Sequence, residues 1–460
     1  MKLDSNGHIL PIYTKSPDIS SAFFILTENC NLRCKYCYEN HKTRIMKPEV
    51  AKDGVDFLFR NSGKDPEIHI TFFGGEPTLH PELMEIIIER AVENIEKPEY
   101  ASKRLEFSII TNCTNFPEKM EKLWLKYGRR FNFSTQLSID GPSHVQNANR
   151  VFVNGKGSWD IVEKNIDKWR ELYKKIGRGG FNVHGCFTKE TIEYMYETYL
   201  YWIEKQNISQ LWFIPVVNSD WNENDSKIYE EQMRKIKDEV IRIAKEKNMP
   251  EFLHSFAPIC NAFSPRGKAQ KLCGAGNNFV SICPDGELSS CHQIQFNVGD
   301  NGYIGDIWNG VDDHKRRFFI EYDGRDFTQC EKCPHEHCYR CLAQSYDTRG
   351  SMMAIAGSEY CKLMLIDHKI QQEIKGEAGY MLNKNVPETN NECLCNLRSE
   401  AGNNDYTKGE KKCNCGDSNC GSKPKYIPEM DNITMEDIIY SIKELDRRFN
   451  RLEQFIINHN

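Results

Sequence analysis

The sequence predicts an α/β fold with a parallel sheet, and two patterns within residues 21–220 support this prediction. Between the strand-length segments lie stretches with apolar residues three and four positions apart, as in amphipathic helices. Alternating strands and helices pack as parallel strands joined by right-handed crossovers. The six apolar segments with the length of strands are Ala22–Thr27, Ile68–Phe73, Leu105–Thr111, Phe133–Ile139, Phe181–Phe187 and Leu211–Val217.

Prolines and glycines mark where the helices are expected to begin and end. Pro48 and Pro81 stand at the start of two amphipathic stretches. Proline is favoured at the first helical position because its missing N–H would be unpaired there anyway. Gly63, Gly128 and Gly177 stand where three such stretches end. These signals place one helix after each of the early strands.

Length and composition limit the architecture and the function classes. A chain of 460 residues is long enough for two or three domains. A net charge of -6 gives no basic footprint for nucleic acid. The N-terminus lacks the apolar core of a signal peptide, and no apolar run has the length of a membrane helix. We therefore expect a soluble, cytoplasmic protein with neither nucleic acid nor membrane as partner.

The 19 cysteines are grouped at short spacings, which in a reducing compartment favours metal binding over disulfides. The first group, Cys30, Cys34 and Cys37, follows the first expected strand. A 4Fe-4S cluster normally takes four cysteines, so this group implies a distant fourth cysteine or an open iron that holds a substrate. Zinc is the alternative, but zinc sites use four ligands in paired motifs, and no second pair lies nearby.

The spacing of these cysteines, with the aromatic Tyr36 before the last one, resembles the signature of the radical S-adenosylmethionine (radical SAM) enzymes. The resemblance implies that Cys30, Cys34 and Cys37 are the catalytic ligands of a 4Fe-4S cluster whose open iron binds the methionine part of S-adenosylmethionine. One electron then cleaves this cofactor to methionine and a 5′-deoxyadenosyl radical. The resemblance also implies a partial (β/α)6 TIM-like barrel with the cysteine loop after its first strand.

A second motif follows the second expected strand. Gly74, Gly75, Glu76 and Pro77 resemble the Gly-Gly-Glu-Pro segment of the same family, which receives the methionine amino group. Glycines suit this task because they let the backbone approach a ligand closely. These four residues and Tyr36 are the cofactor-binding candidates of the first half of the barrel.

Two more cofactor-binding candidates come later in the barrel. Ser138 and Arg150 resemble family positions that line the cofactor, and the planar guanidinium of Arg150 suits the methionine carboxylate. The chain departs from the family just before this arginine, with Gln146-Asn147 where His-Asp is common. Cys113 and Cys186 stand alone in strand contexts, so we expect them to be packing residues.

A helical connector over residues 221–255 is expected to lead to a second cysteine-rich domain at 256–380. Its cysteines and Gly286 resemble the SPASM extension of radical SAM enzymes, which holds two auxiliary 4Fe-4S clusters. Asp285-Gly286 supplies the turn of a hairpin there. By position, the resemblance assigns one cluster to Cys273, Cys291 and Cys341, and the other to Cys330, Cys333, Cys338 and Cys361.

Two questions stay open for these clusters. The first cluster is completed by Cys260, by Cys283 or by an open position. Spacing alone would instead let the four cysteines of residues 330–341 bind one metal as a zinc knuckle. The last two gaps in this segment are also shorter than the family usually has.

The tail contains a linker and a helix. Residues 381–430 are polar and carry five cysteines, for which a zinc or cluster site, a sulfur relay, mimicry of a cysteine-rich peptide substrate and mobile exposed thiols are alternatives. Residues 431–460 repeat apolar positions at gaps of three and four, which predicts an amphipathic helix with a heptad seam. This helix either docks onto its own domain or forms a coiled coil with a second copy or a partner. The tail cysteines are Cys393, Cys395, Cys413, Cys415 and Cys420.

The resulting hypothesis is a radical SAM oxidoreductase of the SPASM group that abstracts hydrogen from a peptide or protein substrate. By resemblance alone, the expected product is a thioether or carbon–carbon crosslink in a ribosomally made peptide. The alternatives are a sulfatase maturase that forms formylglycine from Cys or Ser, and a noncatalytic iron–sulfur or zinc protein. A low-potential donor such as flavodoxin or ferredoxin supplies the electron. The lead-in of residues 1–20 is too short for a leader-binding domain, so leader recognition is expected from the tail or a separate protein.

Overall fold

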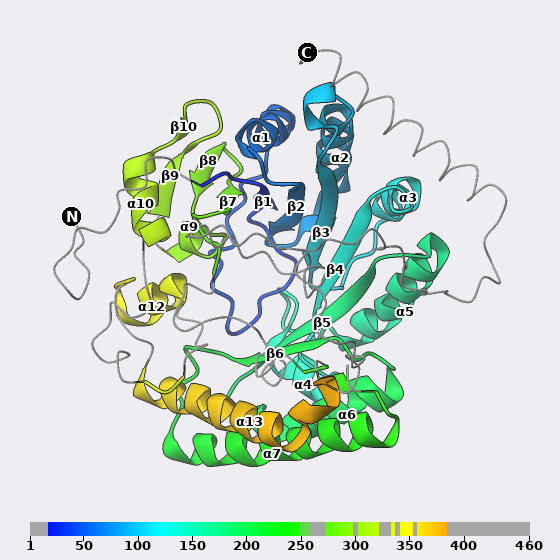
Figure 1. Ribbon diagram of the computed structural model, residues 1–460, viewed down its shortest axis with the longest axis vertical. Coiled ribbons are helices and arrows are strands. Elements are labelled where there is room, and N and C mark those ends of the chain that lie inside the picture. Colours follow the sequence, from blue (N-terminus) through cyan, green and yellow to red (C-terminus); the bar gives the residue numbers. More distant parts are fainter. Residues whose placement is uncertain are drawn as a thin grey trace, which may run out of the picture. The chain divides into compact units, whose positions relative to one another are not determined.

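A computed structural model gives the structure of the chain (Figure 1). It describes residues 17–249, 252–253, 255–256, 273–297, 302–321, 333–335, 341–352 and 357–383. Met1–Leu382 group as one compact unit and Asn383–Asn460 as a second. The expected barrel and the cysteine-rich region after it therefore belong to the same unit.

Six parallel strands form the barrel part of the sheet. Each of them pairs with the next one in the chain. β6 is an edge of the sheet, so the barrel is partial, as the sequence predicts. The strand ends fall within two residues of the expected ones. The strands are β1 (Ser21–Thr27), β2 (Glu67–Gly74), β3 (Arg104–Thr111), β4 (Asn132–Ser138), β5 (Gly180–Phe187) and β6 (Leu211–Pro215).

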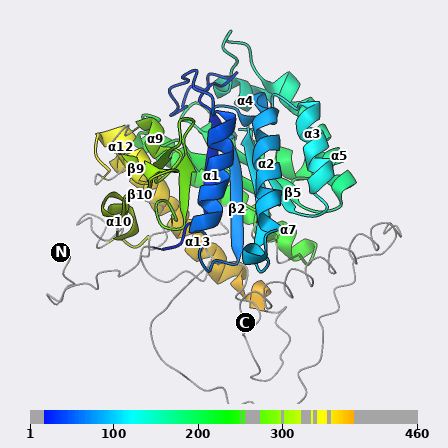
Figure 2. The same ribbon diagram turned by 90° about the horizontal axis from the view of Figure 1, so that it is seen from above.

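Helices follow the strands and cover the outer side of the sheet (Figures 1 and 2). Pro48 and Pro81 are the first residues of their helices, and Gly128 and Gly177 cap two others, as expected. Gly177 has a φ of +79°, a conformation that suits glycine at a helix end. The helices are α1 (Pro48–Asn61), α2 (Pro81–Ile95), α3 (Glu118–Tyr127), α4 (Ser143–Asn149), α5 (Trp159–Ile176) and α6 (Met195–Leu200). Short helical turns are Pro77–Leu79, Pro98–Tyr100, Ile192–Tyr194 and the π-helical Tyr201–Lys205.

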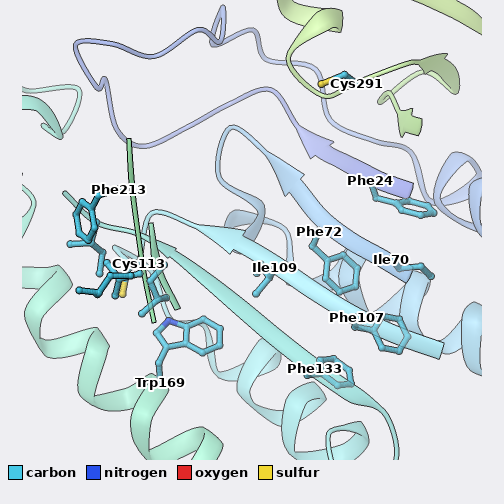
Figure 3. Close-up of a cluster of buried hydrophobic side chains, with 14 of the residues drawn as sticks. Phe24, Ile70, Phe72, Phe107, Ile109, Cys113, Phe133, Trp169, Phe213 and Cys291 are labelled. Atoms are coloured by element: carbon cyan, nitrogen blue, oxygen red, sulfur yellow. The ribbon is translucent and has the colours of Figure 1, made fainter. Parts of the chain in front are cut away.

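Aromatic side chains from neighbouring strands form the core between the sheet and these helices (Figure 3). The ring centroids of Phe72 and Phe107 are 6.2 Å apart, and those of Phe107 and Phe133 are 4.9 Å apart. Trp169 of α5 packs against Trp124 of α3 behind them. Burying each such ring contributes about 1.5–3 kcal/mol, so this layer holds the parallel strands in register.

Four further strands extend the same sheet beyond β1. β7 runs parallel to β1, and β8, β9 and β10 continue in antiparallel order. Gly286 has a φ of +91° in the turn between β7 and β8, which confirms the hairpin expected from Asp285-Gly286. The β7–β10 extension is thus continuous with the barrel sheet. The added elements are β7 (Phe279–Ile282), β8 (Glu287–Ser289), α9 (Ile294–Asn297), β9 (Tyr303–Asp306), β10 (Gly310–Val311), α10 (Asp313–Glu321) and α12 (Leu342–Arg349).

Two long helices pack along each other at the β6 side of the unit: α7 (Glu223–Glu246) and α13 (Ser358–Asn383) (Figure 1). α7 lies within the expected helical connector, residues 221–255. Its first turn is closed by a capping box between Asn222 and Asp225. Arg234 forms an ion pair with Glu373 across the two helices at 2.7 Å, which joins the connector to the end of the cysteine-rich region.

A buried hydrogen bond between these helices makes stability depend on pH. The Tyr229 hydroxyl donates to Asp367 Oδ1 at 2.6 Å, and burial raises the pKa of Asp367 to about 7. A carboxyl with a raised pKa binds its proton more tightly in the folded state, so stability falls as the pH rises from about 4 to 7. Asp367→Asn should therefore stabilise the fold by roughly 1–3 kcal/mol at pH 8 and by less at pH 5. Urea unfolding at both pH values measures this difference, and an equal change at the two would contradict it.

Several expectations fall on residues that the structure does not describe. These are the tail cysteines, the helix at 431–460, and Cys260, Cys330 and Cys338. They stay predictions. Within the part of the chain that is described, no helix is both long enough and apolar enough to cross a membrane.

Candidate radical SAM site

The loop after β1 brings the three cysteines of the first motif to the carboxyl end of the sheet. The Cys37 N–H donates to the Cys34 carbonyl at 3.0 Å, which closes a turn between them. The Cys30 thiol is buried and accepts the Leu32 N–H at 3.4 Å and the Asn112 Nδ2–H at 3.6 Å. Because Asn112 follows β3, the neighbouring strand end helps to orient this sulfur.

The three thiols influence one another electrostatically. Burial raises the pKa of Cys30, Cys34 and Cys37, the last to about 12, and the charge of Cys34 raises that of the other two. Among the described residues, no three His, Cys, Asp or Glu side chains lie close enough to hold a single metal ion. A cubane cluster does not need this, because each thiolate binds a different iron. Three cysteine thiols from one loop are the donor type that holds 4Fe-4S clusters, so the residues present fit such a cluster.

Gly74 and Gly75 bring the end of β2 against this loop. Gly74 has a φ of +138°, and a Cβ there would lie 2.2 Å from the Thr27 carbonyl oxygen. A Cβ on Gly75 would lie 2.2 Å from the Asn29 carbonyl oxygen. Only glycine fits these two positions, so the motif is required for contact between β2 and the base of the cysteine loop.

The Glu76 carboxylate is buried, and both of its oxygens accept hydrogen bonds from other groups of the protein. It accepts hydrogen bonds from the Thr78 N–H and hydroxyl, the Thr111 hydroxyl at 2.7 Å and the Asn112 N–H at 2.8 Å. Burial nevertheless raises the pKa of Glu76. This side chain therefore ties the ends of β2 and β3 together. Pro77 begins the helical turn that follows.

Asp140, after β4, connects the cysteine loop to the later strands. Its carboxylate accepts the Tyr36 hydroxyl at 2.6 Å, the Arg150 Nε–H at 2.9 Å and the Cys186 N–H at 2.9 Å. Burial alone would lower the pKa of Arg150, but the charge of Asp140 keeps it well above its usual value. Arg150 also opposes the effect of burial on the pKa of Cys34, so the arginine lies beside the cluster loop.

Part of this arrangement is not predictable from the sequence. Asp140 is buried and central, yet a single Asp before Gly-Pro suggests only a turn. Cys186 was expected to be a packing residue; instead its thiol faces Tyr36 and Asp140, and burial raises its pKa to about 12. His184 lies on the same strand, opposite Ser138 in the sheet register, and burial lowers its pKa to about 4. Cys113 does pack in the core, as expected.

The second cysteine group includes Cys273, Cys291 and Cys341. Burial raises the pKa of Cys291, and the charges of Cys341 and Cys273 raise it further, so both lie within electrostatic range of this thiol; their assignment to one cluster stays a prediction. The Cys283 thiol donates to Gln295 Oε1 at 2.7 Å, and its place as fourth ligand of this cluster stays a prediction. Cys333 and Cys361 are described, but their two partners are not.

Aromatic side chains lie between the two cysteine groups. The Tyr38 ring packs against His292 and Phe296, with centroids 6.4 and 6.1 Å away. His292 stacks on Phe23 at 4.6 Å, and burial lowers its pKa to about 4. Tyr38 interacts electrostatically with Cys37 as well as with Cys291. Neither Tyr38 nor His292 was singled out from the sequence, since adjacency to a cysteine is a weak signal.

Comparison with models of known protein families shows which family the barrel part of the chain matches. Residues 24–201 match the model of the radical SAM superfamily. The chain contains a radical SAM domain. The match begins in β1 and ends at Tyr201, just after α6, so it covers the cysteine loop, the Gly-Gly-Glu-Pro segment, Asp140 and Arg150. The domain implies a 4Fe-4S cluster and S-adenosylmethionine as cofactors, and it indicates an enzyme.

Curated relatives of the radical SAM domain differ in their activities. The cysteine-type anaerobic sulfatase-maturating enzyme of Clostridium perfringens is 29% identical over 41% of this chain and 50% of its own. The radical SAM cyclopropyl synthase TigE of Paramaledivibacter caminithermalis is 23% identical over 68% of this chain and 65% of its own. The GTP 3′,8-cyclase of Haemophilus ducreyi is 30% identical over 43% of this chain and 53% of its own. The chain thus spans about half to two thirds of these relatives.

Solved structures confirm the fold beyond the radical SAM domain. Native anSMEcpe with bound AdoMet and the Cp18Cys peptide superimposes with a TM-score of 0.61 at 22% identity. The match covers 80% of this chain and 99% of that one. The same protein with bound AdoMet alone gives a TM-score of 0.60. The partial barrel and the sheet extension of the chain therefore have the same architecture as anSMEcpe.

Proposed function

We propose that the chain is a radical SAM enzyme that abstracts hydrogen from a peptide or protein substrate. The observation that carries this proposal is the convergence of the Cys30, Cys34 and Cys37 loop with Asn112 and Arg150 at the carboxyl ends of the strands. Bound there, the cluster and S-adenosylmethionine would supply a 5′-deoxyadenosyl radical at the cost of one electron. The sulfatase-maturating and cyclopropyl synthase relatives support a peptide or protein as the substrate class.

Within this site, we propose that the cofactor-binding candidates identified from the sequence bind S-adenosylmethionine. The backbone of Gly74–Pro77 would receive the amino group of the methionine part. The guanidinium of Arg150 would attract its carboxylate, with Asp140 fixing the orientation of the arginine. Ser138 and Tyr36 would border the cofactor from β4 and from the cysteine loop. Burial of the Asp140 and Arg150 pair keeps water from competing for this charge.

An auxiliary cluster on Cys273, Cys291 and Cys341 would take up the electron that the substrate radical releases. The electron balance then closes, because one electron enters with S-adenosylmethionine cleavage and one leaves with substrate oxidation. We propose a second auxiliary cluster on Cys330, Cys333, Cys338 and Cys361. The favoured product is a thioether or carbon–carbon crosslink, and formylglycine is the second candidate because the fold match to anSMEcpe covers nearly all of that chain.

Anaerobic reconstitution with iron and sulfide, followed by S-adenosylmethionine and dithionite, tests this proposal. We expect 5′-deoxyadenosine by liquid chromatography and mass spectrometry. With a candidate peptide encoded beside the gene, a crosslink removes two hydrogens, whereas formylglycine from cysteine removes two hydrogens and also replaces sulfur with oxygen. A protein that holds its clusters but forms no 5′-deoxyadenosine would overturn the enzyme assignment.

A further inference from the structure

The side of the sheet that faces away from the helices is polar along β4 and β5. From residue 133 to 137 and from 183 to 187, every second residue is buried, and the residues between them are only partly buried. A closed (β/α)8 barrel fills this inner side with bulky branched side chains. Here the inner side instead offers hydrogen-bonding groups. Its residues are Ser134, Gln136 and Ser138 of β4, and Asn182, His184 and Cys186 of β5.

One row of this inner side leads from the cofactor site to an edge of the sheet (Figure 1). Ser138 lies opposite His184 in the strand register, and His184 lies opposite Trp212 of β6. Because side chains alternate along each strand, these three paired residues lie on the same side of the sheet. Ser138 is a cofactor-binding candidate, whereas β6 is an edge strand. The row therefore connects the cofactor to the open side of the partial barrel.

The edge end of this row is apolar. Trp212 is 44% exposed, whereas Leu211 and Phe213, its neighbours in β6, are buried in the main core. Ile214 lies on the same side as Trp212 and is partly buried, opposite Cys186 in the register. A tryptophan ring offers a large flat apolar face, and such rings often anchor bound peptides and proteins. The edge strand thus presents an exposed aromatic face next to the polar strands.

The inner side around this row suits an uncharged ligand. Burial and the charge of Arg150 lower the pKa of His184 to about 4, so its imidazole is neutral at physiological pH. Arg150 itself is paired with Asp140. Gln136 and Asn182 lie opposite each other in the next row, and within the described ranges their amide side chains have no hydrogen-bond partner. Each amide offers two donors and one acceptor oxygen, the groups that a peptide backbone needs.

The length of the row sets a spacing in the ligand. Neighbouring strands lie about 4.8 Å apart, so Trp212 stands about 10 Å from Ser138 across two strand spacings. An extended peptide advances about 3.3–3.6 Å per residue, so about three residues cover this distance. A substrate side chain that reaches Trp212 thus belongs to a residue about three positions away from the one that loses hydrogen beside the cofactor.

We propose that Trp212 and the amides of Gln136 and Asn182 form a substrate subsite for an uncharged peptide segment with an aromatic side chain about three residues from the modified one. This inference rests on the proposed function, to which it adds the class and the spacing of the recognised side chain. The aromatic ring of the substrate packs on the exposed indole of Trp212. The two amides bind the peptide groups between this ring and the modified residue, and the neutral His184 lies beside them.

Two synthetic peptides test this subsite: Ac-Phe-Gly-Gly-Cys-Gly-Gly-Phe-NH2, which serves both chain directions, and the same peptide with Ser in place of each Phe. Their binding to the full-length, reconstituted chain with S-adenosylmethionine is measured by anaerobic titration calorimetry without a reductant, so no turnover occurs. The wild type should bind the phenylalanine peptide about tenfold more tightly than the serine peptide. Trp212→Ala should reduce this preference to less than about twofold, whereas Trp212→Phe should keep most of it because a ring remains.

Trp308→Ala is the matched control. Trp308 is also an exposed indole, at 57%, but it lies in the turn between β9 and β10, where its N–H donates to Asp53 of α1. This variant should keep the wild-type preference. The peptide Ac-Gly-Gly-Phe-Cys-Phe-Gly-Gly-NH2 should bind the wild type no better than the serine peptide, because its rings stand too close to the cysteine to reach Trp212.

The subsite and the proposed function can fail separately. Equal binding of the phenylalanine and serine peptides by the wild type would overturn the subsite, as would binding of neither peptide or a preference that Trp212→Ala retains. Equal binding of the two phenylalanine peptides would overturn the spacing. Absence of 5′-deoxyadenosine from the wild type with dithionite would instead remove the proposed function, while the titrations, which need no reductant, would still report on the subsite.

Discussion

Replacing Cys30, Cys34 and Cys37 together with alanine is expected to abolish 5′-deoxyadenosine formation and to remove about four irons per chain, one cluster's worth. The thiols are the only sulfur donors that the β1 loop provides, and their electrostatic coupling places them together. Without them no open iron remains to bind the methionine part of the cofactor. Iron analysis after reconstitution and the dithionite-driven rate, expected below about one thousandth of wild type, measure the two losses.

Cys113→Ala provides the matched control for this variant. Cys113 is also a buried cysteine of the radical SAM domain, but it lies in the core, with its Sγ 3.9 Å from the Val162 carbonyl oxygen. Its loss should cost only a modest amount of packing energy and leave both iron content and rate close to wild type. A triple alanine variant that kept its full iron content would show that other cysteines hold all the metal.

The cysteine motif and the Gly-Gly-Glu-Pro motif could be predicted from the sequence because their signals are local. Three cysteines within eight residues, and two adjacent glycines after a buried strand, need no knowledge of distant contacts. The close approach of Gly74 and Gly75 to Thr27 and Asn29 supplies the physical reason for those glycines. The parallel strand order was likewise predictable, since each strand pairs with the next one in the chain.

The rest of the site depends on register between distant strands, which periodicity does not encode. Cys186 reaches Asp140 because β5 pairs with β4 in a particular register. His292 reaches Tyr38 because the β7–β8 hairpin joins the sheet next to β1, and nothing in the sequence of that hairpin indicates its neighbour. The pairing of β7 with β1, the first strand of the barrel, was not indicated by the sequence for the same reason, and the expected domain boundaries stay predictions.

Asp140 is the residue where the greatest loss of stability is expected. Its carboxylate is fully buried and accepts three hydrogen bonds, from Tyr36, Arg150 and Cys186. Asn in its place keeps the shape but presents one oxygen and an NH2 group, which repels the Arg150 guanidinium and offers nothing to a second donor. Breaking a buried ion pair from one side costs roughly 3–5 kcal/mol, because the remaining charge stays buried without compensation.

Asp140→Asn should therefore lower the free energy of unfolding by that amount, measured by urea denaturation of the protein as purified. Glu67→Gln, which breaks the exposed Arg104 and Glu67 pair on the same sheet, is the control and should cost less than about 1 kcal/mol. The two pairs share their charge types and differ in burial, so the difference between the variants isolates the effect of the buried arginine. Equal losses in the two variants would mean that Asp140 does not hold Arg150 in the way the geometry indicates, and the orientation of the arginine toward Cys34 would need another explanation.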